Sequence, residues 1–255
     1  MLRRLATRRE RGQVVGDAAI VVAGVVFVLA ICELLYLLDW YSQRGRLADD
    51  YIFYVELAQR FLRDGTLYGD RQLTGHSYTV LVNIDNIYPP PSIALFIPFA
   101  FLPAVLWWLI PLGVLAYTVW RLKPARWTWP LLAVCLVWPR TIGSLVVGNS
   151  DIWSAALVAG GILWGWPGAL GLFKPAFGPF ALAGARRRSW WVAAGFFTAW
   201  SAILWPYWGQ YLVVASNWDV PITRSIANIP LLLLPVIAWL GRSRTRHSPS
   251  NGLSQ

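Results

Sequence analysis

Lys174 is the residue of this chain whose position most clearly indicates chemistry. It is the one charged side chain between residues 152 and 185, in a run that is otherwise uncharged. Holding an ammonium group at membrane depth costs free energy, and such residues usually face a cavity and carry function. Pro175 follows directly, and proline breaks a helix. We therefore expect a cationic site beside a helix break, with an ion pair to Asp151 or Glu33 as the structural alternative.

Two neighbouring carboxylates, Asp49 and Asp50, begin the second segment that can do chemistry. Residues 50–64 place apolar side chains at helical spacing, and Gly65 is a good helix stop. We expect an amphipathic helix that lies in the membrane interface with its apolar face down. Its acidic start would then lie near the membrane surface, where the carboxylates either cap the helix or provide a general base.

Composition indicates what kind of protein must position these residues. The chain has 255 residues, of which 57% are hydrophobic and 13% are charged, and it contains 17 Trp. That is too apolar and too aromatic for an ordinary soluble domain. Several apolar runs approach the roughly 20 residues that cross a bilayer. The runs are residues 18–38, 102–120, 129–147, 152–166, 190–205 and 226–240. We expect an all-α polytopic membrane protein whose first run is retained as a span.

The net charge of +10 follows from where the basic residues lie, and nucleic acid is not an expected partner. Basic residues cluster before the first apolar run, in two short loops and after the last run. The clusters are residues 3–11, 121–126, 186–188 and 242–246. Short basic loops stay cytoplasmic, whereas residues 39–91 hold seven acidic residues against five arginines. We expect a plasma-membrane protein with both termini cytoplasmic and the 39–91 loop outside.

The lengths of the apolar segments indicate how the first half of the chain crosses the membrane. Residues 92–120 measure ~44 Å as a helix, which is too long for one crossing and too short for three. One crossing preceded by a half-helix fits, with the break near Pro98 or Pro103. Residues 127–147 then cross outward, and residues 207–224 form a second outer loop further on.

The stretch from Asp151 to Arg186 would measure ~53 Å as a helix, which also does not equal a whole number of membrane crossings. We expect one full span, residues 152–166, and then a re-entrant hairpin with its tip at residues 173–175. Irregular backbone at membrane depth is tolerated only beside protein or a water-filled cavity, so a cavity is expected at this tip.

Together these segments predict about six to eight membrane segments, including short re-entrant half-helices. They form one domain, residues 1–241, followed by a disordered cytoplasmic tail at residues 242–255.

Several short motifs follow one another between residues 50 and 191. They are Asp50-Tyr51 with the aromatic residues to Ala58, Gly65 with Tyr68, Tyr88-Pro89-Pro90 with Pro98 and Pro103, Gly148-Asn149, and Lys174-Pro175 ahead of Arg186–Arg188. In this order and spacing the chain resembles the type-C-fold membrane glycosyltransferases, most of all the polyprenol-phosphate-mannose-dependent mannosyltransferases of bacterial envelopes. The turn reads Gly-Asn here, where Gly-Gln is commoner in the family.

The resemblance implies inverting transfer of a hexose such as mannose from a polyprenyl-phosphate carrier to a glycan or glycolipid acceptor at the outer face. It assigns Asp50, with Asp49 as the alternate, to take the proton of the acceptor hydroxyl. The departing lipid phosphate needs a cation or hydrogen-bond donors. The candidates for this role are Lys174, Arg140, Asn149, Tyr88 and His76.

Other chemistries are disfavoured, and two other functions stay open. The two histidines, His76 and His247, are predicted on opposite sides of the membrane, and no Gly-rich nucleotide loop appears, so no metal or cofactor is expected. Broken helices also build the sites of transporters and flippases. A relative without catalysis would act as a membrane scaffold. For Arg140, snorkelling to the interface is the favoured structural explanation.

Overall fold

The computed structural model describes residues 2–74, 85–217 and 226–242, and every regular element within these ranges is a helix. The predicted all-α class is therefore confirmed. The α-helices are α1 (Leu2–Gln43), α2 (Asp49–Asp64), α3 (Asp70–Thr74), α4 (Ile93–Phe96), α5 (Leu106–Leu122), α6 (Trp129–Val137), α7 (Pro139–Val147), α8 (Asp151–Trp164), α9 (Trp166–Leu170), α10 (Gly178–Ala181), α11 (Arg188–Ile203), α12 (Trp208–Asn217) and α14 (Ile229–Leu240).

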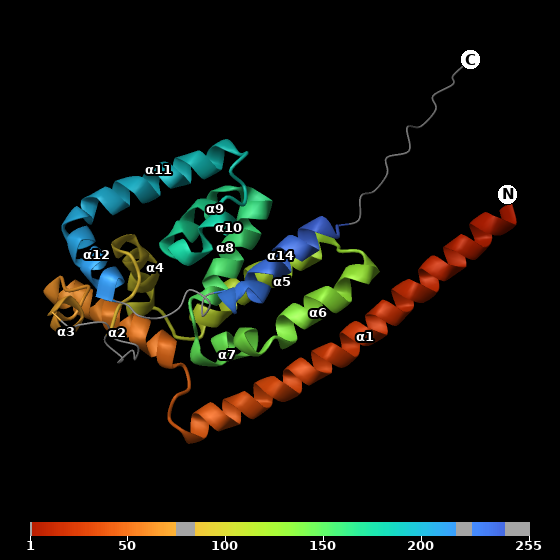
Figure 1. Cartoon of the computed structure of the whole chain (residues 1–255), viewed down its shortest axis with the longest axis horizontal. Coiled ribbons are helices and arrows are strands. Elements are labelled where there is room, and N and C mark those ends of the chain that lie inside the picture. Colours follow the sequence, from red (N-terminus) through yellow and green to blue (C-terminus); the bar gives the residue numbers. More distant parts are fainter. Residues whose placement is uncertain (1, 75–84, 218–225, 243–255) are drawn as a thin grey trace, which may run out of the picture.

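Figure 1 shows α1 as a long rod along one side of the molecule, with α6 and α7 beside it. The contact uses small side chains, with Ala23 and Ala30 of α1 buried, and also large ones. The large ones are Leu34, Leu37, Leu38 and Tyr41, which pack partly buried near Ile142 and Val146 of α7, while many other large apolar residues of α1 are exposed. At the centre, α8 packs against α5 and α14. The indole of Trp107 on α5 is fully buried there and contacts the rings of Tyr54 and Trp153.

The predicted break before α5 is present. The chain runs through two 3₁₀ turns, Pro90–Ser92 and Ile97–Ala100, on either side of α4, and α5 begins only at Leu106. The outward crossing expected for residues 127–147 is not one straight helix. It bends by 55° between α6 and α7, because Pro139 cannot continue the hydrogen bonding of α6.

A hairpin follows α8 at the expected place in the chain. The chain reverses at Gly165, whose φ is +90°, and α9 runs back along α8 to a tip at Lys174. It returns through α10 to Gly184, the second reversal with a φ of +90°. The two arms touch backbone to backbone, since a Cβ on Gly168 would lie 1.9 Å from the carbonyl oxygen of Ala183. Glycine is required at this approach.

The predicted amphipathic helix is α2, which ends where expected, with Gly65 donating its N–H to the Phe61 carbonyl. Its start differs from the prediction. Ala48, at φ 61°, is the N-cap residue, and Asp49 and Asp50 lie in the first turn without capping it. Its apolar face also covers protein rather than membrane, because Tyr54 is buried where α2 packs on α4 and the second 3₁₀ turn.

The structure does not confirm the predicted six to eight membrane segments. Among the described residues, one helix, Gln13–Gln43, is long and apolar enough to cross a bilayer alone, and the bent pair α6–α7 is a second only if the bend falls within one span. Four other apolar helical stretches of 10–17 residues fall short of that length. They are Pro90–Ala100, Leu106–Leu122, Asp151–Trp164 and Ile229–Leu240.

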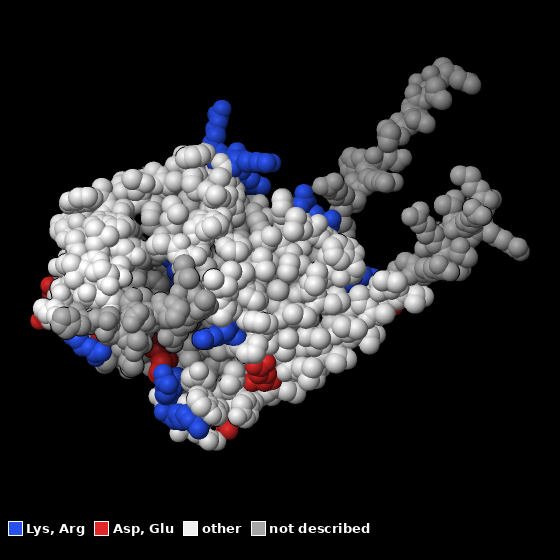
Figure 2. Space-filling model, viewed as in Figure 1, with Lys and Arg blue, Asp and Glu red and all other residues white. Residues whose placement is uncertain are grey.

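The surface nevertheless carries a broad apolar band. Large apolar side chains from several helices are exposed, among them Leu109 at 57%, Phe196 at 74% and Trp205 at 71%. Figure 2 shows a wide uncharged band between an edge where Lys and Arg gather and an opposite edge that carries both signs of charge. Soluble monomers rarely expose so much contiguous apolar surface.

Candidate functional site

The candidate site is built around the turn from Gly148 to Asp151, which joins α7 to α8. Gly148 ends α7 at φ +71°, and a Cβ there would lie 2.8 Å from both the Trp108 ring and the Cβ of Tyr51. The indole of Trp107 donates to the Gly148 carbonyl at 2.8 Å. The turn is therefore held from both α2 and α5, and only glycine fits at its start.

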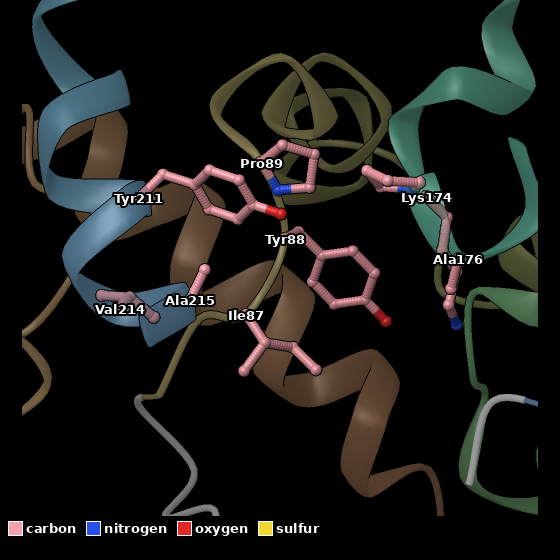
Figure 3. A pocket seen from close by; sticks show the side chains of 9 residues that line it. Ile87, Tyr88, Pro89, Lys174, Ala176, Tyr211, Val214 and Ala215 are labelled. Carbon is pink, nitrogen blue, oxygen red and sulfur yellow. The ribbon is translucent and has the colours of Figure 1, made fainter. Parts of the chain in front are cut away.

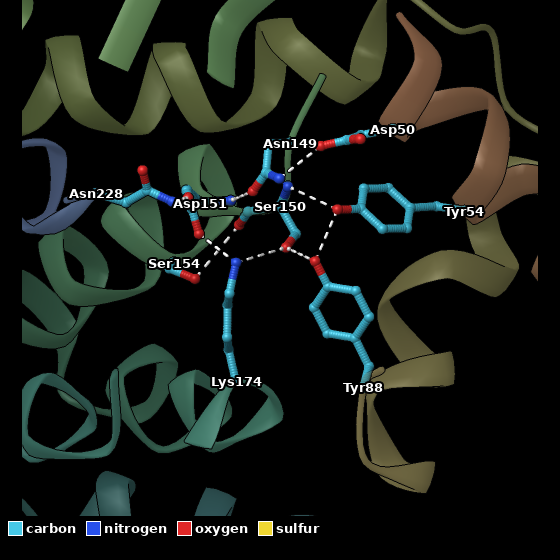
Figure 4. A network of polar contacts seen from close by, with 9 residues as sticks. All are labelled: Asp50, Tyr54, Tyr88, Asn149, Ser150, Asp151, Ser154, Lys174 and Asn228. Atoms are coloured by element: carbon cyan, nitrogen blue, oxygen red, sulfur yellow. Dashed lines mark hydrogen bonds and ion pairs between the residues drawn. The ribbon is translucent and has the colours of Figure 1, made fainter. Parts of the chain in front are cut away.

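Asp50 reaches this turn from the first residues of α2. Its carboxylate accepts a hydrogen bond from the Asn149 side-chain amide at 2.5 Å (Figure 4). Asp50 is part-buried, and burial raises the pKa of its carboxyl above the usual value, while the Asn149 hydrogen bond and the positive charge of Lys174 offset part of that rise. A carboxyl with a raised pKa is a better proton acceptor than an ordinary surface Asp, which suits a general base.

Lys174 reaches the same turn from the tip of the hairpin. Its ammonium group forms an ion pair with the fully buried carboxylate of Asp151, and the other oxygen of that carboxylate accepts from the Asn228 amide at the start of α14. This is the ion pair that the sequence offered as the structural alternative. It ties the hairpin, α8 and α14 together at one point (Figure 4).

Two tyrosines complete the network. The hydroxyl groups of Tyr54 and Tyr88 lie 2.8 Å apart, and the Tyr88 hydroxyl lies 2.8 Å from the Ser150 hydroxyl. The backbone N–H of Ser150 donates to Tyr54 at 3.2 Å, and Lys174 donates to the Ser150 hydroxyl at 3.5 Å. The hydroxyl groups and the ammonium group of this network all have partners, as buried polar groups require, whereas the buried Oδ1 of Asn228 has none among the described residues.

A cavity of about 200 Å³ opens beside this network. Figure 3 shows Tyr88 between Tyr211 of α12 and Lys174 of the hairpin, all three lining it. The expected cavity at the hairpin tip is therefore present. Asp50 is not among its lining residues, and the Asn149–Ser150 turn lies between the Asp50 carboxylate and Lys174 (Figure 4).

The structure thus brings together Asp50, Asn149, Tyr88 and Lys174, four of the residues singled out from the sequence. Asp49 turns away to pair with Arg46 at 2.8 Å.

Arg140 is exposed in the first turn of α7. This helix is ~12 Å long, and its opposite end, at Val147, leads into the site, so Arg140 lies away from the site. His76 lies outside the described residues. Among the described residues no group of His, Cys, Asp and Glu can hold a metal ion.

Sequence reasoning missed three members of the network. In the sequence, Tyr54 is one of the side chains at helical spacing within residues 50–64, and nothing there indicates a hydrogen-bonding role for its hydroxyl. Ser150 was seen as part of a turn, with no signal for its role. Asn228 is 77 residues from Asp151, and no local pattern could have paired them.

No protein-family model, curated protein or solved structure matches the chain. What the fold defines is an all-helical protein with a buried ionic network beside a cavity.

Proposed function

We propose that the protein is an integral membrane glycosyltransferase of the plasma membrane that takes a hexose from a polyprenyl-phosphate carrier and passes it to a glycan or glycolipid acceptor on the outer face. One observation supports this most. A part-buried carboxylate and a largely buried ammonium group, far apart in the sequence, belong to one hydrogen-bonded network that borders a cavity.

Asp50 is the general base in this proposal. It takes the proton of the acceptor hydroxyl as the hydroxyl oxygen forms a bond to the anomeric carbon. The bond between that carbon and the phosphate oxygen breaks, and the electron pair leaves with the lipid phosphate. For this step the hydrogen bond from Asn149 to Asp50 must be exchanged for one from the acceptor.

Lys174 and Tyr88 receive the donor phosphate, since both line the cavity. The ammonium group has three N–H donors, of which Asp151 and Ser150 take two. One donor of the ammonium group remains for a phosphate oxygen, and the phenol O–H of Tyr88 becomes another when Tyr54 and Ser150 both donate to its oxygen. Charge-assisted hydrogen bonds of this kind stabilise the leaving group as its charge develops.

The first test replaces the base. Asp50→Asn should lower transfer by about a hundred- to ten-thousand-fold, because the amide cannot take a proton. Purified protein is incubated with radiolabelled polyprenyl-phosphate sugars and a panel of envelope lipids. Asp49→Asn is the matched control, since the neighbouring carboxylate faces Arg46 and should be dispensable. Undiminished turnover in both variants would remove the assignment of Asp50.

A non-catalytic scaffold is the second candidate, and the Lys174–Asp151 ion pair favours it. The double variant Lys174→Met/Asp151→Asn separates the two functions because it leaves no unpaired buried charge. A donor-binding role predicts weaker competition by unlabelled polyprenyl phosphate in a folded double variant. Unchanged lipid competition would return Lys174 to a purely structural role.

A further inference from the structure

A second cavity, of about 500 Å³, lies at the opposite end of α8 from the candidate site. Asp151 begins α8 at the site and Trp164 ends it at this cavity, so about 20 Å of helix separates the two. The cavity lies where the C-terminal ends of α5, α8 and α14 meet. Three arginines and three aromatic residues dominate its wall. They are Arg121, Arg187, Arg242, Tyr117, Trp164 and Trp239.

Hydrogen bonds within the protein occupy only some of the N–H donors of these arginines. Arg187 donates to the carbonyls of Leu163 and Ile162 at the end of α8, and Arg242 donates to the Trp239 carbonyl at 2.6 Å. These bonds satisfy helix C-termini, where cations are favourable. A guanidinium carries five N–H donors, so most of them remain available.

No acidic residue balances this charge within the part of the chain that the structure describes. The ion pairs there join other residues, and none of the cavity-lining residues is acidic. Arg121 is exposed at the end of α5. Three guanidinium groups around one cavity match the oxygen atoms of a phosphate, which arginine binds bidentately.

The aromatic residues and the surroundings indicate where that phosphate comes from. The rings of Tyr117 and Trp164 are stacked with an interplanar angle of 11°, and both are more than 40% exposed. Trp120 and Leu240, at the same helix ends, are each 66% exposed. Exposed apolar side chains therefore flank the cavity, as a lipid with a polar headgroup and acyl chains requires. Free phosphate needs no such apolar surroundings.

We propose that this cavity binds the phosphate-bearing headgroup of an anionic membrane lipid. Basic pockets between helices at the cytoplasmic end of membrane proteins bind such headgroups. The site is separate from the one proposed for sugar transfer and does not depend on catalysis.

The test titrates short-chain lipids into the purified full-length chain in nonionic detergent and counts bound lipid by native mass spectrometry. Dioctanoyl phosphatidylglycerol should bind saturably, and dioctanoyl phosphatidylcholine should bind much more weakly. Glycerol 3-phosphate is the soluble arm and should compete poorly because it lacks acyl chains. Competition by glycerol 3-phosphate at equal concentration, or equal binding of the two lipids, would overturn the proposal.

A matched pair of variants locates the site. Arg121→Gln should weaken phosphatidylglycerol binding by about fivefold, the effect of roughly one basic charge at a membrane surface. Arg188→Gln removes the same charge from an exposed residue that does not line the cavity, and its binding should be unchanged. An equal loss in both variants, or no loss in Arg121→Gln, contradicts the assignment. A melting temperature equal to wild type confirms that each variant is folded.

Discussion

Burial of the Asp50 carboxylate lowers the stability of the folded protein. Burial raises the pKa of its carboxyl above the unfolded value of 3.8, so stability is lost as the pH rises from about that value through the raised pKa. Asp50→Asn keeps an oxygen that can accept from Asn149 and removes the charge. Its melting temperature should therefore exceed that of wild type at neutral pH, and the difference should vanish below pH 3.8.

Thermal denaturation across a pH series measures this difference. Asp49→Asn provides the control, because it removes an ion pair with Arg46 on the surface and should slightly lower the melting temperature or leave it unchanged. A lower melting temperature for Asp50→Asn at neutral pH would show that the fold stabilises this carboxylate instead. Groups that reduce stability in this way are commonly retained for function.

The Lys174–Asp151 ion pair predicts strong non-additivity. Lys174→Met alone leaves the fully buried Asp151 carboxylate without its cation and should cost about 3–5 kcal/mol of unfolding free energy. Adding Asp151→Asn removes the stranded charge and should recover most of that loss. Denaturation of the two single variants and the double variant measures the coupling. Additive losses would mean that the charges do not interact in the folded protein.

At the residue scale, the sequence identified charged residues better than their neutral partners. Lys174 stood out because an ionisable group is conspicuous in an apolar run, whereas Asp50 was favoured over Asp49 by its place in the Asp50-Tyr51 motif. The partner of Lys174 could be narrowed to Asp151 or Glu33, since few acidic residues lie near the apolar runs. Tyr54 looked like one more aromatic residue on an apolar face, because only the tertiary contacts show that its hydroxyl reaches Ser150.

At the scale of secondary-structure elements, the lengths of the sequence segments were the most informative feature for predicting the fold. The hairpin around Lys174 and the break before α5 both follow from stretches that are too long for one crossing and too short for three. The bend at Pro139 was missed, because residues 127–147 have the length of one straight span. The burial of α2 was missed for another reason. An amphipathic face does not itself reveal whether protein or lipid covers it.

The hairpin depends on glycine where its arms meet. Gly168→Ala would place a methyl group 1.9 Å from the Ala183 carbonyl oxygen and should destabilise the fold by about 1–3 kcal/mol or more. Gly195→Ala is the matched control in α11, where a Cβ meets nothing within 4 Å. It should be neutral or stabilise by up to about 1 kcal/mol, because alanine favours helix. Equal melting temperatures for the two variants would contradict the close packing of the arms.

At the scale of the whole molecule, charge is separated along one direction. The basic loops that precede α6 and α11 lie at the edge where Lys and Arg gather, and the turn after α1 lies at the mixed edge (Figure 2). The uncharged band between them includes helices shorter than a full span. α5, with 17 residues, measures about 25 Å against roughly 30 Å of hydrocarbon. In the proposed membrane protein, packing of such short helices against one another, as α5 packs against α8 and α14, would hold a thin bundle in the bilayer.

For the proposed membrane protein, this charge separation predicts which edge faces which side of the bilayer. Basic loops remain cytoplasmic, so position 186 should face inward and position 64 outward. Both Arg186 and Asp64 are exposed, which suits them to single-cysteine labelling once Cys32 and Cys135 are replaced by alanine. A membrane-impermeant maleimide should label Asp64→Cys in intact cells and Arg186→Cys only after permeabilisation. Labelling of both positions from the same side would place the two edges on one face of the membrane. The candidate site and the arginine-lined cavity would then no longer lie at opposite ends of a bilayer.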